Sequence, residues 1–275
     1  DAIFLSFTNK LEKKGNNIIS VGVNALSQFE AIEKFQRIEG LEKTICLIPE
    51  DHFRDEIEMG LLSTNIKLKK KYFYESDPTL LTKRIEKITK YDRRKQNLAD
   101  EIKRVEESDE FNKEKIIENL EKKDTLGKVN FDSVIISAFD ETLKSITTSL
   151  IYTDVTPKKT YFITLNQWFD ESLLKEDSSQ NLYFPSINKK NFDEFKQEYF
   201  KKYSSEPNQI SLLGFDLVGL IFYLSKVNDF QLNNKVFDQK NTFKGKIGLF
   251  EIEDKRIKHV LNFYKVENNK FKKIF

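Results

Sequence analysis

The stretch FKGKIGLFEIEDKRIKHVLNFYKVENNKF, residues 243–271, decides the fold. Its apolar and polar residues alternate in two runs, which meet at the charged turn 253–255 and end at Asn268 and Asn269. Alternation with a period of two is typical of strands, and short polar turns between such runs predict hairpins. A chain that elsewhere alternates helices with single strands therefore closes on antiparallel strands.

Upstream of this hairpin, short apolar runs alternate with helical periodicity. Phe29, Ile32, Phe35 and Ile38 recur at three-residue steps, which predicts a helix with one apolar stripe. The strand-like runs are AIFLSF (2–7), TICLIP (44–49), KLKKKYFY (67–74), DSVIIS (132–137) and TYFITLN (160–166). Helices between single strands indicate an α/β protein with mostly parallel, doubly wound sheets.

The apolar run 210–227 has the length of a membrane span, but Asp216 lies near its middle. The strictly apolar stretch after Asp216 is too short to cross a bilayer. We therefore expect a helix buried between a sheet and its neighbours, with no transmembrane span in this chain.

Residues 80–124 are dominated by charge and contain neither Gly nor Pro. Leu98, Ile102 and Val105 form a narrow apolar seam, which predicts one long helix or two. Either these helices close on themselves and need no partner, or they form an arm that meets one. In the second interpretation, long basic side chains face an acidic partner surface: Arg93, Arg94, Lys103 and Arg104.

Composition and motifs argue against several classes of function. The 275 residues carry 46 Lys and Arg against 44 Asp and Glu, without a basic stripe, so no nucleic-acid partner is expected. His52 and His259 lack metal-ligand neighbours, and Cys46 lies in a strand-like run without a paired base. No Gly-rich phosphate loop occurs. We therefore expect no enzyme, no metal and no cofactor.

The end of the chain resembles a known family. GFDLVGL (214–220) followed by F-x-G-x-x-G-x-F (243–250) and NNKFKKI (268–274) is similar to the C-terminus of the type I periplasmic binding proteins, the Leu/Ile/Val-binding-protein-like components of ABC importers. YDRR (91–94), DTLG (124–127), FDSV (131–134), Trp168 and Asp170 resemble its penicillin-binding-protein activator branch, found in alphaproteobacteria.

The resemblance implies a two-lobed α/β fold. Residues 2–7 look like the fourth strand of the first lobe, so that lobe is expected to be incomplete at its N-terminus. The expected division assigns 1–64 and 205–240 to the first lobe, and 65–204 and 241–275 to the second, with a helical insert over 84–123.

Ligands of open α/β sheets bind beyond the carboxyl ends of the strands. This rule nominates five cleft residues: Ser137, Phe139, Asn166, Trp168 and Phe184. In amino-acid-binding relatives, hydroxyls after the fourth strand hold the ligand carboxylate, and Ser6 and Thr8 match them loosely. Equally, both hydroxyls could simply cap the next turn.

The resemblance implies a non-catalytic protein of the periplasm. The helical insert favours a regulator that contacts a peptidoglycan synthase. The alternative is the solute-binding component of an ABC importer for an amino acid or a similar small polar ligand. Whether a lipid ahead of Asp1 anchors the protein in the outer membrane stays open.

Overall fold

The computed structural model describes residues 3–10, 18–229, 234–237, 240–246, 248–253 and 256–275. Most of the chain surrounds a seven-stranded sheet of order β12-β11-β7-β6-β5-β3-β4. Its strands are β3 (Thr44–Pro49), β4 (Leu68–Tyr74), β5 (Ser133–Ile136), β6 (Tyr161–Thr164), β7 (Leu182–Ser186), β11 (Asn262–Glu267) and β12 (Lys270–Lys273). β3 to β7 pair in parallel, and only β11 and β12 run antiparallel. The expected α/β class with a mostly parallel sheet is confirmed.

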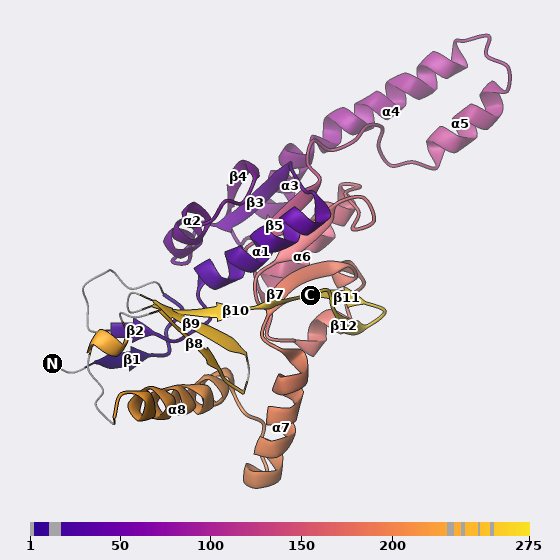
Figure 1. The fold of residues 1–275 in the computed structure, drawn as a ribbon. Helices are drawn as coiled ribbons and strands as arrows, with labels where there is room; N and C mark the ends of the chain where they lie inside the picture. The colour runs from indigo at the N-terminus through magenta and orange to yellow at the C-terminus, as the bar shows by residue number, and fades with distance from the viewer. Residues whose placement is uncertain (1–2, 11–17, 230–233, 238–239, 247, 254–255) are drawn as a thin grey trace.

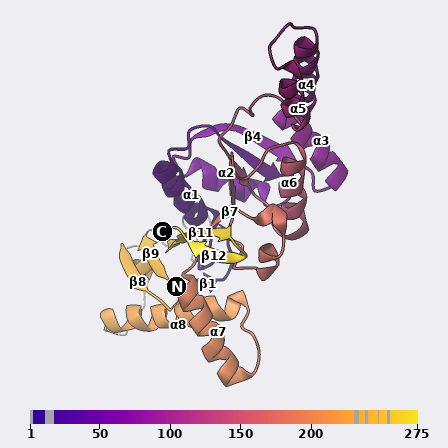
Figure 2. The same cartoon turned by 90° about the vertical axis from the view of Figure 1, so that its right-hand side faces the viewer.

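Helices cover both faces of this large sheet (Figure 2). α1 (Ala25–Glu39) packs with α2 (Arg54–Leu62), and α3 (Pro78–Thr89) packs with α6 (Asp140–Tyr152). Strands covered on both sides must be apolar throughout, and every residue of β3 and β5 is buried. α7 (Lys189–Tyr203) follows β7 and extends toward the smaller lobe (Figure 1).

The smaller lobe holds two short sheets and one long helix (Figure 1). β1 (Phe4–Ser6) pairs in parallel with β2 (Ile18–Ser20), and β8 (Asn241–Lys244), β9 (Leu249–Glu253) and β10 (Arg256–Val260) form an antiparallel sheet. α8 (Gln209–Val227) lies beneath them. The stretch 243–271 thus builds two sheets, because its first hairpin stays in the smaller lobe and β11 crosses to the large sheet.

The structure draws the border between the lobes differently from the sequence analysis. Residues 44–49, expected in the first lobe, form β3, which lies between β4 and β5 of the large sheet. α1, also expected in the first lobe, packs against β7 and β11. A strand buried on both faces is stable only inside a covered parallel sheet. The chain therefore leaves the smaller lobe between β2 and α1.

α8 is buried on one face rather than all round. Its inner face holds Leu212, Leu213, Asp216, Leu217, Leu220 and Leu224. Its outer face exposes Ile210, Phe215, Val218, Phe222, Tyr223 and Val227. By length and composition alone it is the one helix among the described residues that could cross a membrane, a test that core helices also pass. The expectation of a fully enclosed helix was therefore wrong.

The insert forms two helices, α4 (Tyr91–Glu106) and α5 (Lys113–Glu121), which project away from the body (Figure 1). Leu98, Val105 and Leu120 form a small core of their own between these helices. We call α4, α5 and their connection the arm.

Candidate ligand cleft

A cavity of about 730 Å³ lies at the carboxyl ends of β3, β4, β5 and β6. Strand ends supply Pro49, Tyr74, Ser137 and Asn166, while Asn9 reaches it from the smaller lobe. In doubly wound α/β sheets, this edge is where ligands bind.

The floor of the cavity is held by hydrogen bonds between neighbouring strand ends. The Ser137 backbone N–H donates to the Leu47 carbonyl at 3.1 Å, and the Tyr74 hydroxyl donates to the Ser137 carbonyl at 2.8 Å. Burial raises the pKa of Tyr74, so the hydroxyl keeps the proton that it donates. The ends of β3, β4 and β5 are thereby fixed to one another.

Hydrogen bonds fix both the backbone and the side chain of Asn166 in the wall of the cavity. Its backbone N–H donates to Gln28 Oε1 at 2.8 Å, and its Oδ1 accepts from the Trp168 backbone N–H at 3.0 Å and from Ser186 Oγ at 2.8 Å. A backbone N–H can only donate, so this contact identifies Oδ1 and leaves Nδ2 as the free end of the amide.

Nδ2 of Asn166 has no hydrogen-bond partner among the described residues, although the residue is only 4% exposed. A buried donor left unsatisfied costs about 1–3 kcal/mol. Asn166 also lines the cavity, so this unsatisfied donor lies in the cavity wall.

The charged groups among the described residues that line the cavity are acidic. They are Asp51, Glu56, Asp140 and Asp170, and this described part of the lining contains no Lys, Arg or His. Asp51 Oδ1 accepts from the Phe53 backbone N–H at 2.8 Å. Burial raises the pKa of Glu56, and the positive charge of Lys10 lowers it in part.

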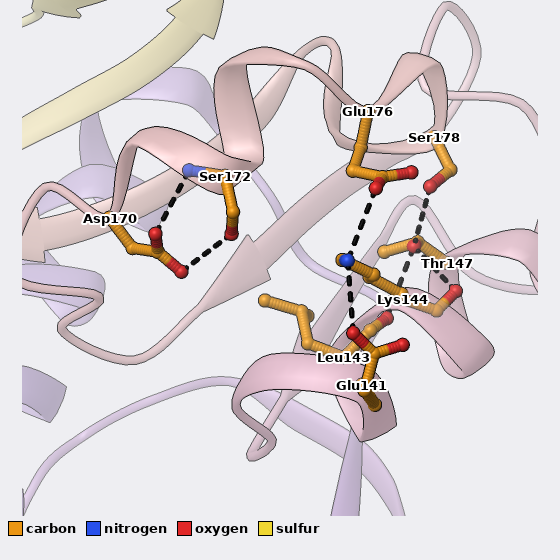
Figure 3. A network of polar contacts seen from close by, with 8 residues as sticks. All are labelled: Glu141, Leu143, Lys144, Thr147, Asp170, Ser172, Glu176 and Ser178. Atoms are coloured by element: carbon orange, nitrogen blue, oxygen red, sulfur yellow. Dashed lines mark hydrogen bonds and ion pairs between the residues drawn. The ribbon is translucent and has the colours of Figure 1, made fainter.

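Figure 3 shows how the loop that carries Asp170 is fixed. Asp170 accepts from the Ser172 backbone N–H at 2.9 Å and from its hydroxyl at 2.7 Å, at the start of η1 (Glu171–Leu174). Lys144 of α6 pairs with Glu141 at 3.0 Å and with Glu176 at 3.1 Å, just ahead of η2 (Asp177–Ser179). The loop is thus tied to α6.

Three of the eleven described non-glycine residues with positive φ lie at the same rim. Asp140, Trp168 and Phe169 have φ values of 48°, 50° and 58°. Non-glycine residues seldom adopt the left-handed region, and aromatic residues do so less readily than Asp or Asn. Strain of this kind often accumulates at functional sites, where the surrounding structure fixes it.

The structure brings together four of the residues nominated from sequence. Ser137, Phe139, Asn166 and Trp168 line the cavity. Phe184 does not, because its side chain points into the core, where its ring contacts Phe169 and Tyr264.

Ser6 and Thr8 are also absent from the lining. Thr8 Oγ1 accepts from the Lys10 backbone N–H at 3.1 Å, which is a local turn contact. The sequence analysis missed Asp51, Glu56 and Asp140. The strand-end rule itself points to Asp51, which lies two residues beyond β3.

The basic residues proposed for the arm do not form one surface. Arg93 is exposed, whereas Arg94 is 5% exposed and donates to the carbonyls of Thr89 and Thr153 and to Thr125 Oγ1. Arg94 was therefore wrong as a partner-facing residue, because the first turn of α4 faces the body. Lys103 pairs with Glu107 at 3.9 Å, and Arg104 pairs with Glu101 and Glu110 at 2.9 and 2.8 Å.

Burial keeps Cys46 and His259 in their uncharged forms at neutral pH. Burial raises the pKa of Cys46 to about 12 and lowers that of His259 to about 4. Within the described residues, no group of three or more His, Cys, Asp or Glu could hold a metal ion.

Solved structures with this arrangement of strands and helices are numerous. No protein-family model matches the sequence, and no curated protein matches it either. A leucine-bound ABC transporter substrate-binding protein from Desulfitobacterium hafniense is 11% identical, with a TM-score of 0.56, over 99% of this chain and 73% of that one. The chain has the type I periplasmic-binding-protein fold.

Two further structures show how widely this fold is used. The C-domain of LpoA from Haemophilus influenzae, a regulator of PBP1A, is 12% identical, with a TM-score of 0.55, over 98% of this chain and 73% of that one. An ABC transporter solute-binding protein from Rhodopseudomonas palustris BisB5, in complex with 3,4-dihydroxybenzoic acid, is 11% identical, with a TM-score of 0.50. The match covers 90% of this chain and 62% of that one. This chain thus spans less than two thirds of that structure. Binding proteins and a regulator share the fold, and these identities favour neither.

Proposed function

We propose that this protein is a non-catalytic binding protein of the periplasm that holds a small ligand in the cleft between its lobes. The observation that carries the proposal is the Nδ2 of Asn166, a buried donor without a partner among the described residues, beside a cavity of about 730 Å³. That volume suits a small molecule. A ligand acceptor at Nδ2 would remove the cost of the unsatisfied donor.

The test is isothermal titration of the protein with a panel of amino acids and related amines, followed by the variant Asn166→Asp. This variant keeps Oδ1 for Trp168 and Ser186 but replaces the donor with a second acceptor. We expect affinity for the ligand to fall at least tenfold, or about 1.4 kcal/mol. Asn130→Asp, the same change at an exposed residue outside the cavity, should leave affinity unchanged. No binding to any panel member would contradict the proposal.

The second candidate function is regulation of a peptidoglycan synthase through the arm. The observation that favours it is Phe111, which lies between α4 and α5 at the end of the arm and is 92% exposed. A large apolar side chain presented to solvent on a projection is typical of a residue that anchors a protein partner. The LpoA C-domain, which belongs to a regulator of PBP1A, has the same fold and so supports this candidate. Under this candidate function, we propose that the protein is anchored in the outer membrane.

Biolayer interferometry against a purified bifunctional peptidoglycan synthase tests this candidate. Phe111→Ser should weaken binding at least tenfold if the aromatic ring fills a pocket. Leu62→Ser provides the matched control, because Leu62 is 79% exposed on α2 of the body. Equal binding by both variants would exclude the arm tip as the contact.

A further inference from the structure

The charges around the cleft narrow the class of ligand. We infer that the ligand carries a net positive charge or a quaternary nitrogen, together with an oxygen acceptor, as basic amino acids and betaines do. This inference rests on the proposed small-ligand function and concerns the same cavity.

The charged side chains around the cavity determine the sign of the electric field inside it. Its four carboxylates come from four separate places: Asp51 after β3, Glu56 in α2, Asp140 at the start of α6 and Asp170 before η1. Among the described residues that line the cavity, none is basic. Charges of one sign around a cleft with low-dielectric walls add, and they attract a ligand of the opposite sign. These four carboxylates would repel an anionic ligand.

These four carboxylates have no ion-pair partner among the described residues. Some acids elsewhere in the chain do form ion pairs, as Glu30 with Lys258 at 3.1 Å and Glu176 with Lys144 at 3.1 Å. Asp51 and Asp170 accept only from nearby backbone N–H groups and a hydroxyl. Glu56 is half-buried, and the positive charge of Lys10 acts on its carboxylate.

Asp140 is the clearest case. No hydrogen bond or ion pair of its side chain occurs within the described part of the chain, and its backbone has a φ of 48°. The positive end of α6, which begins at Asp140, stabilises this carboxylate, but no side chain of the described residues pairs with it. A cation in the cavity would supply a partner.

Aromatic rings also line the cavity. Phe53 and Phe139 line the cavity and are 44% and 41% exposed, and Trp168 lines it half-buried. Faces of aromatic rings attract ammonium and guanidinium groups, and quaternary amines are commonly held by such rings. Aromatic rings among carboxylates favour an organic cation. A bare metal ion is disfavoured, because no cluster of three potential ligands exists among the described residues.

The Nδ2 of Asn166, unpartnered among the described residues, also limits the choice of ligand. It is a buried atom of a residue that lines the same cavity, and it can only donate. It therefore calls for an oxygen acceptor on the ligand, a carbonyl or a carboxylate. Together with the four carboxylates, it specifies a molecule with a positive nitrogen at one end and an acceptor at the other.

The experiment is isothermal titration with arginine, lysine, glycine betaine, leucine and glutamate under one buffer. The tightest cationic or betaine probe should bind at least about tenfold more tightly than leucine and glutamate. If leucine or glutamate binds most tightly, the inference fails while the proposed function stands. If none of the probes binds, both fail.

A variant pair tests the charge directly. Asp140→Asn removes the charge, keeps the shape and tolerates the left-handed backbone as Asp does. Because Asp140 makes no internal hydrogen bond within the described residues, this change should leave the melting temperature nearly unchanged. Affinity for the tightest cationic probe should fall about three- to tenfold, and less so at 1 M salt. Asp109→Asn, at an exposed carboxylate of the arm, is the matched control. Equal affinity of both variants and the native protein would overturn the inference.

Discussion

Asp216 in α8 accepts a hydrogen bond at 2.6 Å from the backbone N–H of Lys246, at the turn between β8 and β9. The buried carboxylate thus holds the β8–β9 turn onto the helix. This contact connects the two motifs GFDLVGL and F-x-G-x-x-G-x-F, which lie far apart in the sequence. It also explains why the turn carries a glycine.

Gly245→Ala should destabilise the smaller lobe. A Cβ at position 245 would lie 2.5 Å from the Asp216 Cγ and 2.6 Å from the Phe250 ring, so the turn must shift. Overpacking of this kind costs about 1–3 kcal/mol in the free energy of unfolding. Urea denaturation measures the loss. Gly248→Ala is the control, because a Cβ there would meet nothing within 4 Å. Equal stability of the two variants would show that the turn moves freely.

Arg94→Met should lower the free energy of unfolding by about 2–4 kcal/mol, because the carbonyls of Thr89 and Thr153 lose their buried donor. Arg93→Met changes an exposed neighbour on the same turn and should have an effect below about 0.5 kcal/mol. Thermal unfolding followed by circular dichroism compares the two. If Arg94→Met leaves the free energy of unfolding unchanged, Arg94 is not needed for the fold and is again a candidate for binding a partner.

Acid should weaken the protein through His259. Its Nε2 lies 2.8 Å from the Val21 carbonyl oxygen, which only accepts, so the ring is neutral with its proton on Nε2. Burial lowers the pKa of His259 from its usual value of 6.5 to about 4. The unfolded chain therefore binds this proton at a higher pH than the folded chain does.

The His259 contribution is thus fully present above pH 6.5 and is lost as the pH falls toward 4, up to about 3 kcal/mol. Urea titrations between pH 7 and pH 4 measure this slope. His259→Gln, which keeps a donor for Val21, should make stability flatter over this window. If the stability of the variant depends on pH in the same way as that of the native protein, other titratable groups cause the loss of stability in acid.

Cys46 should be unreactive in the folded protein. The thiol is buried, and burial raises its pKa to about 12, so almost no thiolate exists at neutral pH. Labelling with a thiol-specific reagent at pH 8 should proceed only as fast as the protein unfolds. Rapid labelling without denaturant would show that β3 opens in the native state.

The arm should be removable without unfolding the body. Leu98, Val105 and Leu120 form a cluster separate from the main core. Asn97 Nδ2 donates to the Leu126 carbonyl at 3.5 Å, and the Leu126 backbone N–H donates to the Arg94 carbonyl at 2.9 Å, so the ends of the arm lie together.

Replacement of residues 98–122 by a short Gly/Ser linker should change the free energy of unfolding of the body by less than about 1 kcal/mol. Differential scanning calorimetry measures this change. A linker of the same composition in place of β11 serves as the opposite control, because that strand pairs inside the large sheet. Collapse of the arm-less variant would show that these helices belong to the core.

The sequence by itself determined the α/β class, the long charged helices and several residues of the cleft. Residues such as Ser137 and Asn166 follow apolar strands directly, and parallel strands end at a common edge, so local pattern was enough to place them. The same pattern could not tell that Phe184 points inward, because the face of a strand depends on what covers the sheet.

Only the tertiary structure decided the rest. β3 belongs to the large sheet because it pairs with β4 and β5, and strand pairing at long range leaves no mark in local periodicity. Arg94 is buried because the body closes over the first turn of α4, although its neighbour Arg93 reaches solvent. The acidic cleft likewise draws Asp51, Glu56, Asp140 and Asp170 from separate elements. Their common field exists only after folding, since Coulomb interactions depend on distance in space and not on distance along the chain.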